Sequence, residues 1–237
     1  MKEIKKILIL RFGAIGDVVH STELFRSIKR KHPEVSIHYV SFKTPAENIK
    51  NDPDLDKVWI AEGKNYKQLY ELAKQLRKER YDAFLSLQPG TRTRIFSLML
   101  GMPKTVTYKK TFKLHAVENF WRTGKALFPD IELDRRLYLH INPQVKEKVS
   151  GMLGKNGLII ALNMGVSATR QGRRWSQDNW RELAKGFLDK YKGCKILLAG
   201  SSQDMEFAEP LLGISSDVIS FCGKLSVEEN TALLSLC

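Results

Sequence analysis

Residues 6–22 read KILILRFGAIGDVVHST, and this stretch decides the fold. A short apolar run ends at Leu10, two glycines follow at Gly13 and Gly16, and Asp17 opens a helical pattern. The apolar run predicts a buried strand, and the glycines predict a tight turn into a helix. A strand, a turn and a helix in this order are typical of a parallel α/β sheet, whose carboxyl edge is where such folds bind ligands. Asp17 is expected at that edge.

The alternation of short apolar runs with helical stretches continues along the chain. In the first part it predicts strands at 6–10, 36–40, 57–60, 83–87 and 105–108, with helices at 18–31 and 66–80. A strand-like RLYLHI follows at 136–141. In the second part it predicts strands at 158–163, 195–199 and 218–221, with helices at 177–190, 204–212 and 227–236.

Asn142-Pro143 and the glycines at 151, 154 and 157 interrupt this alternation. They predict a linker, so we expect two Rossmann-like domains: residues 1–142, a linker at 143–157, and residues 158–237. Three strands make only half of a doubly wound sheet, which leaves the second domain incomplete.

Composition excludes several classes of protein. The 237 residues are 43% hydrophobic, which argues against disorder, and no apolar run approaches the roughly 18 residues of a membrane helix. We therefore expect a cytoplasmic protein. The three cysteines form no CxxC pair and the histidines are scattered, so neither a disulfide nor a metal site is expected.

The charge is unevenly distributed. Of the net charge of +13, residues 1–142 carry +11, from 27 basic and 16 acidic residues. Between residues 92 and 125, eight cations face Glu118 alone: Arg92, Arg94, Lys104, Lys109, Lys110, Lys113, Arg122 and Lys125. Such a block attracts an anionic partner. Nucleic acid, an anionic membrane, an acidic small substrate and a merely solvated face all remain open at this point.

Five segments in order resemble one family. They are RFGAIGDVVHSTELFRSIKRKHP at 11–33, YDAFLSLQPGTRT at 81–93, RRWSQDNWRELAKGF at 173–187, ILLAGSSQDMEFAE at 196–209 and FCGKLSVEENTALL at 221–234. They resemble the bacterial heptosyltransferases of glycosyltransferase family 9, which build the lipopolysaccharide inner core. The resemblance implies a GT-B architecture, ADP-heptose as donor, an anionic Kdo–lipid A acceptor, and no catalytic metal or other cofactor.

The resemblance assigns Asp17 as the general base. Transfer with inversion is a single displacement, so one group must remove the proton of the acceptor hydroxyl while its oxygen attacks the anomeric carbon. A carboxylate on the acceptor domain suits that task. The alternative role of Asp17 is to cap the helix that it opens.

The donor site is expected on the second domain. Gly165, Ser167 and Thr169 follow a predicted strand and can supply backbone and hydroxyl contacts to phosphate. Arg173 stands where the resembling enzymes usually carry a phosphate-binding lysine. It is alternatively a solvated surface residue. Similarity to the family suggests that Asp204 binds the ribose hydroxyls, with capping of the next helix as the alternative.

The acceptor site is expected on the basic first domain, at Gly13, Gly16, His20, Arg92, Lys109, Lys110 and Lys113. His20 is alternatively a structural histidine. The same cations would hold the protein at the cytoplasmic face of the inner membrane. We expect a monomer that binds no nucleic acid.

Family members continue beyond the position equivalent to Leu236 into a further strand, a D-x-G-x-x-H loop and a helix. We therefore expect a chain that is C-terminally truncated relative to its family, with exposed apolar surface beside the strand at 218–221. An inactive remnant and an anion-binding module for nucleic acid or membranes stay as alternatives to an active enzyme.

Overall fold

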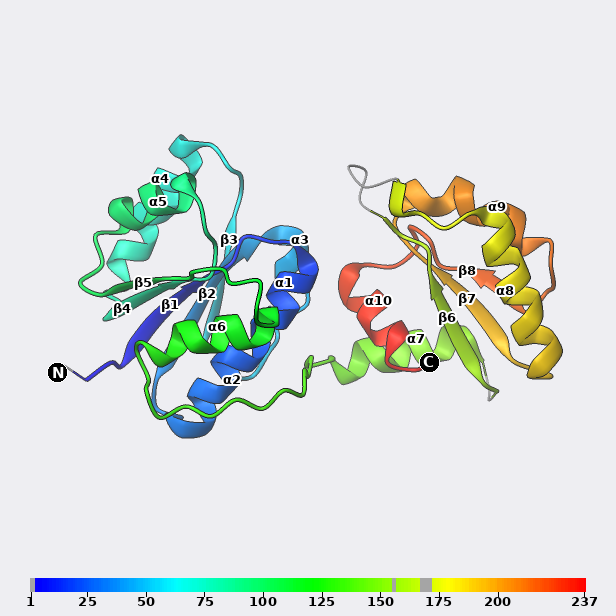
Figure 1. Cartoon of the computed structure of the whole chain (residues 1–237), viewed down its shortest axis with the longest axis horizontal. Coiled ribbons are helices and arrows are strands. Elements are labelled where there is room, and N and C mark those ends of the chain that lie inside the picture. The colour runs from blue at the N-terminus through cyan, green and yellow to red at the C-terminus, as the bar shows by residue number, and fades with distance from the viewer. Residues whose placement is uncertain (1–2, 155–156, 167–171) are drawn as a thin grey trace. The chain divides into compact units, whose positions relative to one another are not determined.

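The computed structural model describes residues 3–154, 157–166 and 172–237. The chain folds into two compact units, Met1–His140 and Ile141–Cys237. Each unit is a β-sheet covered by α-helices (Figure 1). The boundary lies close to the end of the expected first domain. Within the segment expected as a linker, Pro143–Leu153 forms helix α7, which packs in the core of the second unit.

The first unit has a five-stranded parallel sheet in the order β3-β2-β1-β4-β5. Its strands are β1 (Lys6–Leu10), β2 (Ser36–Phe42), β3 (Lys57–Ala61), β4 (Ala83–Ser86) and β5 (Thr105–Thr107). All five expected strands are confirmed. The chain runs outward from β1 to β3 and then returns to β4 on the other side, so the strand order reverses between β1 and β4. In open α/β sheets this reversal opens a crevice at the carboxyl edge.

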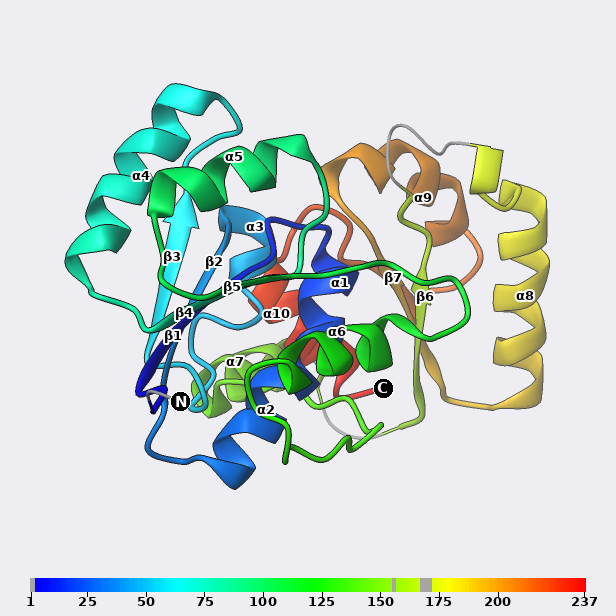
Figure 2. The ribbon, with the colours of Figure 1, turned by 60° about the vertical axis from the view of Figure 1, so that its left-hand side comes forward.

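Helices cover both faces of this sheet. One face carries α1 (Ile15–His20), α2 (Thr22–Lys31) and α6 (Ala116–Lys125), and the other carries α4 (Tyr66–Lys78) and α5 (Thr91–Leu100) (Figure 2). The short helix α3 (Lys43–Ala46) follows β2. The continuous apolar run of β1 explains the two layers, since Ile7 and Ile9 pack with the first set and Leu8 and Leu10 with the second.

The single helix expected at 18–31 is two helices, α1 and α2. Ser21 separates them: its hydroxyl donates to the Val18 carbonyl at 2.7 Å and lies 2.6 Å from the Tyr39 hydroxyl on β2. This buried contact fixes Ser21 in the core. The first helix is therefore short, with Asp17 in its first turn.

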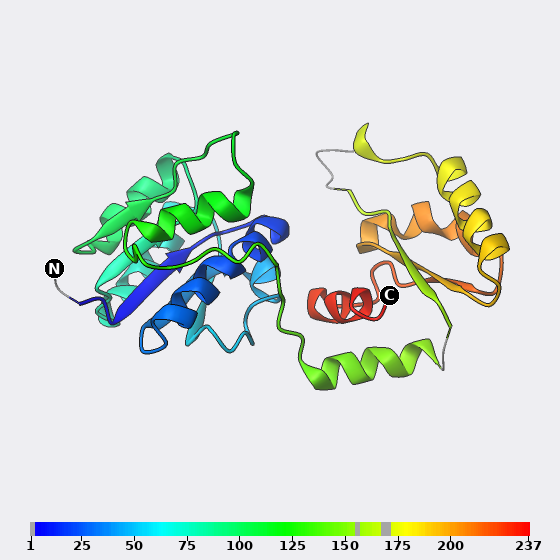
Figure 3. The ribbon, with the colours of Figure 1, turned by 60° about the horizontal axis from the view of Figure 1, so that its bottom comes forward.

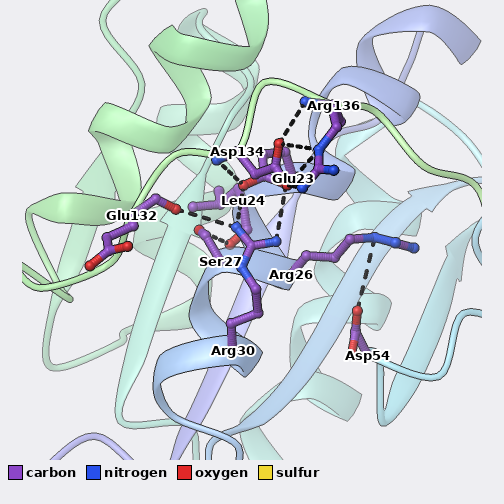
Figure 4. Close-up of polar contacts among 9 residues, drawn as sticks. All are labelled: Glu23, Leu24, Arg26, Ser27, Arg30, Asp54, Glu132, Asp134 and Arg136. Atoms are coloured by element: carbon purple, nitrogen blue, oxygen red, sulfur yellow. Dashed lines mark hydrogen bonds and ion pairs between the residues drawn. The ribbon is translucent and has the colours of Figure 1, made fainter.

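No strand forms at 136–141, so the expectation for RLYLHI is wrong. Residues 132–138 instead form a strap held on α2 (Figure 4). The buried Glu23 carboxylate accepts from the Asp134 backbone at 2.8 Å and pairs with Arg30 at 2.5 Å. Arg30 also donates to the Glu132 carbonyl, and Tyr138 lies beneath the Arg26 guanidinium at 4.6 Å. Side-chain contacts with a helix, rather than pairing with a strand, hold this segment.

The second unit has a parallel sheet in the order β6-β7-β8, formed by β6 (Ile159–Asn163), β7 (Lys195–Ala199) and β8 (Val218–Ser220). One face packs against α8 (Gln177–Lys190) and α9 (Met205–Leu212), and the other against α7 and α10 (Val227–Leu234) (Figure 3). The three expected strands are confirmed, and β8 is an edge strand with β7 as its partner. The expected helix at 204–212 begins with a 3-10 turn at Ser202–Asp204.

Candidate active site

Asp17 lies at the carboxyl edge of the first sheet. It occupies the first turn of α1, just beyond the central strand β1, and its carboxylate accepts from the Ala14 backbone N–H at 3.3 Å. Ala14 is the residue that caps the helix, so Asp17 braces the helix start without being its cap. The Asp17 side chain is 37% exposed, which leaves a carboxylate that a ligand can reach.

A buried arginine that the sequence analysis missed fixes this carboxylate. Arg11 follows β1 directly, and its Nη2 forms an ion pair with Asp17. Its Nη1 donates to the Leu87 carbonyl at the end of β4 at 2.7 Å, and its guanidinium lies 5.6 Å from the Phe120 ring of α6. Arg11 thus joins the ends of β1 and β4, the two strands between which the sheet order reverses. The signal in the sequence was an arginine placed immediately after the buried run ILIL.

His20 lies one turn after Asp17, and its ring packs edge to face against His115 with centroids 5.0 Å apart. Its buried Nδ1 has no hydrogen-bond partner among the described residues. Burial, followed by the neighbouring His115, lowers the pKa of His20 below its usual value. His20 is therefore a neutral side chain at neutral pH that lies on the same short helix as Asp17.

A pocket of about 690 Å³ opens at the turn that follows β1, and Arg11, Asp17 and His20 lie outside its lining. Its lining comes from the segments that follow β1, β2, β3 and β4: Phe12, Gly13, Ala14, Phe42, Pro45, Lys64, Tyr66, Gln88, Pro89, Gly90, Thr91, Arg92 and Thr93. None of these residues is acidic. The stacked rings of Phe12 and Phe42, with centroids 4.8 Å apart, give the pocket an apolar wall.

Positive charge in the pocket comes from three sources. Lys64 and Arg92 both line it, and the first turn of α5, which begins after Gly90, directs free backbone N–H groups to its edge. The α5 first turn contains no acid that would offset this charge. A pocket with this lining suits an anionic ligand that also has an apolar or sugar face.

The structure divides the expected acceptor residues. Gly13 and Arg92 line the pocket, together with Lys64 and Tyr66, which the sequence analysis missed. Gly16 is not among the lining residues, and a side chain built there would meet nothing within 4 Å.

Lys109, Lys110 and Lys113 also lie outside the pocket lining. They are exposed on the segment that joins β5 to α6. The expected acceptor set therefore consists of a pocket group and a separate surface group.

Only part of the expected donor site can be placed. Ser167 and Thr169 lie outside the described residues. Gly165 follows β6 at the carboxyl edge of the second sheet, where its backbone N–H donates to the Asn163 side chain at 3.2 Å. Arg173 is exposed and forms no ion pair with the described residues.

Asp204 lies beside Gly165, since a Cβ on Gly165 would come 3.3 Å from Asp204 Oδ2. The carboxylate is buried and both of its oxygens have partners. Oδ1 pairs with Arg174, while Oδ2 accepts from the Ser201 backbone at 2.8 Å and from the Ser201 hydroxyl at 2.7 Å. The contacts with Ser201 belong to the start of the 3-10 turn at Ser202–Asp204, and the Asp204 side chain forms no cap hydrogen bond to α9. Its burial leaves almost none of the carboxylate exposed to a ribose.

Two further properties concern metals and membranes. In the part of the chain that the structure describes, no group of three or more His, Cys, Asp or Glu side chains is placed to hold a metal ion. Among the same residues, no helix combines the length and apolar character needed to cross a membrane.

The cysteines Cys194, Cys222 and Cys237 are free thiols.

Known sequences resemble this chain over most of its length. The sequence pattern described as glycosyltransferase family 9 (heptosyltransferase) matches residues 142–237. Lipopolysaccharide heptosyltransferase 1 of Campylobacter coli is 24% identical over 254 residues, which cover 94% of this chain and 74% of the relative. Lipopolysaccharide core heptosyltransferase OpsX of Haemophilus influenzae is 28% identical over 189 residues, which cover 78% of this chain and 48% of that relative, about half its length.

Solved structures share the fold. A glycosyltransferase of family 9 from Veillonella parvula has a TM-score of 0.85 at 19% identity, over 98% of this chain and 73% of that one. Heptosyltransferase WaaC of E. coli, solved with ADP-2-deoxy-2-fluoro heptose, has a TM-score of 0.73 at 16% identity, over 97% and 80%.

The two parallel-sheet units and these solved structures define a GT-B-like fold, as expected from the sequence. The match of residues 142–237 to glycosyltransferase family 9 and the resemblance to two lipopolysaccharide heptosyltransferases place the chain among the glycosyltransferases. Both resemblances agree with the family expected from the sequence.

Proposed function

We propose that the protein transfers a heptose from ADP-heptose to the Kdo–lipid A inner core of lipopolysaccharide, with inversion at the anomeric carbon. The names of its relatives support the reaction class, since both are lipopolysaccharide heptosyltransferases. The nucleotide sugar is supported by the WaaC structure, which holds an analogue of ADP-heptose.

The observation that carries the proposal is the part-exposed Asp17 carboxylate at the carboxyl edge of the first sheet, hydrogen-bonded to Ala14, which lines the cationic pocket. In the proposed step, Asp17 takes the proton of an acceptor hydroxyl while that oxygen forms a bond to the anomeric carbon. The bond from this carbon to the β-phosphate oxygen breaks, and ADP leaves with the electron pair. Arg11 holds the carboxylate in place, so the base does not have to be ordered when the acceptor binds.

The pocket is the proposed acceptor site. Kdo carries a carboxylate and lipid A carries phosphates, and both are anions that match Lys64, Arg92 and the α5 N-terminus. The apolar wall of Phe12 and Phe42 would lie against a sugar ring. Gly13 lines this pocket, and His20 lies on the Asp17 helix.

The second unit is the proposed donor site. Negative charge grows on the β-phosphate as ADP leaves, and donors directed at it stabilise the transition state. We assign this role to Arg173 and to the backbone that follows β6 at Gly165, with Ser167 and Thr169 as further phosphate contacts. In this proposal the cationic side chains supply the positive charge, and no metal ion is required.

The proposed location is the cytoplasmic face of the inner membrane, where the acceptor lipid lies. The first unit carries +11 of the net charge, which favours association with an anionic leaflet. The proposed form is a monomer, because all the proposed acceptor and donor residues belong to one chain.

A direct assay tests the reaction. The protein is incubated with ADP-heptose and a Kdo–lipid A acceptor, and both ADP release and the mass of the product are followed. Asp17→Asn should lower the turnover rate by about 100-fold or more, the usual effect of losing a general base. ADP affinity measured by calorimetry should stay the same in both proteins.

The matched control is Asp189→Asn, which removes an exposed carboxylate on α8. It should leave the rate unchanged. Wild-type protein that forms no product would refute the proposed reaction. An Asp17→Asn protein with the wild-type rate would refute the assigned base.

A further inference from the structure

The segment that joins β5 to α6 presents one aromatic ring to solvent. Phe112 is 90% exposed, the highest value among the large exposed hydrophobic residues in the described part of the chain. Residues 109–114, which we call the tip, read KKTFKL and place Lys109, Lys110 and Lys113 around this ring. Figure 3 shows the segment between β5 and α6 running outward to an apex before it turns back into α6.

The shape of the tip is fixed from inside. Asn119 on α6 is buried, and its side-chain amide donates to the Thr111 carbonyl at 2.9 Å and to the Leu114 carbonyl at 3.1 Å. The Lys113 backbone donates to the Thr111 hydroxyl at 3.2 Å. The exposure of Phe112 is therefore a consequence of a held conformation, and ordering this ring on binding costs little conformational entropy.

The residues at both ends of the tip strengthen this hold. Before the tip, Tyr108 packs on Phe120 of α6 with ring centroids 5.0 Å apart. After the tip, the His115 side chain accepts from the Val117 backbone and caps α6. The tip is thus supported on α6 at its start, its middle and its end.

Charge around the ring is of one sign. No acidic residue occurs between residues 83 and 117, and six cations do: Arg92, Arg94, Lys104, Lys109, Lys110 and Lys113. The Lys110 ammonium lies 4.6 Å from the centroid of the Phe112 ring. An apolar ring surrounded by lysines matches the boundary between anionic headgroups and acyl chains.

The burial of the other aromatic residues near the tip indicates whether a membrane or a nucleic acid is the better partner for it. Sequence-tolerant binding of single strands uses several rings on which successive bases stack. Here Tyr108 and Phe120 are buried against each other, and Trp121 is partly covered beneath Lys125. Of the aromatic residues between positions 105 and 125, Phe112 is the single exposed one, and one ring suits an anchor in a bilayer better than a stacking platform.

We propose that the tip docks on an anionic lipid surface, with Phe112 inserted below the headgroups and Lys109, Lys110 and Lys113 among the phosphates. This contact deepens the proposed membrane location without depending on sugar transfer, because it requires neither donor nor acceptor. It also gives the surface group of lysines a role separate from that of the pocket.

Vesicle binding tests the proposal. The protein is sedimented with vesicles of phosphatidylcholine alone, or of phosphatidylcholine with 30% phosphatidylglycerol. Wild-type protein should bind the anionic vesicles, and Phe112→Ser should weaken this binding about tenfold, as expected when one buried aromatic ring is lost. Phe112→Trp should bind as wild type, and its emission should shift to the blue on anionic vesicles relative to wild type.

The matched control is Tyr70→Ser. Tyr70 is an exposed ring on α4 with the Lys74 ammonium 5.3 Å from its centroid, so it has the same chemistry outside the tip. It should bind anionic vesicles as wild type does. ADP affinity should be the same in all variants, which separates this test from that of the transfer reaction.

Two results would overturn the proposal. The first is wild-type protein that ignores anionic vesicles, or a Phe112→Ser protein that binds them equally well. The second is single-stranded DNA that binds the protein in a Phe112-dependent manner and displaces it from vesicles, because this would assign the tip to nucleic acid.

Discussion

The guanidinium of Arg11 forms an ion pair with the carboxylate of Asp17 while it also donates to the carbonyl of Leu87. A single buried side chain thus connects the proposed base with the end of the neighbouring strand. The position of the Asp17 carboxylate depends on a residue that need not contact a substrate.

Replacing Arg11 with Lys should lower the turnover rate about tenfold without changing the affinity for ADP. A lysine keeps the charge but lacks the planar fork that contacts both Asp17 and the Leu87 carbonyl. Steady-state kinetics and calorimetry check this. The control is Arg77→Lys, since Arg77 donates to the Met99 carbonyl in the same unit and lies outside the pocket lining. An Arg11→Lys enzyme with unchanged turnover would remove Arg11 from the mechanism.

Lys64→Ala and Arg92→Ala should each raise the acceptor KM about tenfold, because each removes a cation from the pocket. The donor KM should be unaffected. Lys67→Ala, which removes an exposed cation from α4 that does not line the pocket, should leave both constants unchanged. Equal acceptor constants in wild type and both pocket variants would place the acceptor elsewhere.

Glu23→Ala should lower the free energy of unfolding by about 2 kcal/mol, because it leaves the Asp134 N–H and the Arg30 guanidinium without their buried partner. Urea denaturation measures this change. Hydrogen exchange should rise at residues 132–138, the strap. Glu71→Ala, which breaks an exposed pair with Lys74, should change stability by less than about 0.5 kcal/mol. An unchanged exchange rate in the strap would contradict this account of how it is held.

Because of His38, we expect the free energy of unfolding to fall in mild acid. Burial, followed by the charge of Lys6, lowers the pKa of His38 from 6.5 to about 4. In the unfolded chain, His38 becomes protonated below about pH 6.5. In the folded protein, it becomes protonated only near pH 4. Stability attributable to His38 is therefore complete above pH 6.5 and falls as the pH drops toward 4.

This loss amounts to about 2 kcal/mol when partial screening by solvent is allowed for. Urea denaturation at pH 7 and pH 5 should show a smaller difference for His38→Gln, which keeps a polar partner for the Tyr81 hydroxyl but does not titrate. Hydrogen bonds from Lys6 and Lys57 hold the pKa of Glu79 near 2. In the folded protein Glu79 therefore stays ionised between pH 7 and pH 5, the range of this measurement. The same slope in both proteins would exclude His38 as the cause.

Local sequence patterns predicted most of the strands and helices. They failed where contacts with residues far away in the sequence determine the conformation of a segment. The strands and the turn at Gly13 follow from buried apolar runs and glycine spacing. The period of RLYLHI looks like a strand, but its Tyr138 ring lies against Arg26 of α2, and Arg30 of α2 holds Glu132 just before it, which no local pattern reveals.

The site shows the same division. Asp17 could be predicted because it is contiguous with its strand. Lys64 and Tyr66 could not, because they follow another strand and reach the pocket only through the order of the sheet. Asp204 looked like a ligand, and its partner Arg174 comes from 30 residues away.

Consecutive residues of α6 have different neighbours: Asn119 holds the tip, and Phe120 lies beneath Arg11. One turn of helix therefore connects the proposed lipid contact with the proposed base. In that docking, the depth at which Phe112 inserts would set the distance of the Asp17 carboxylate from the bilayer. Only acceptor hydroxyls at that distance would be reached, so the proposal makes the length of the acceptor's sugar chain a criterion of substrate choice.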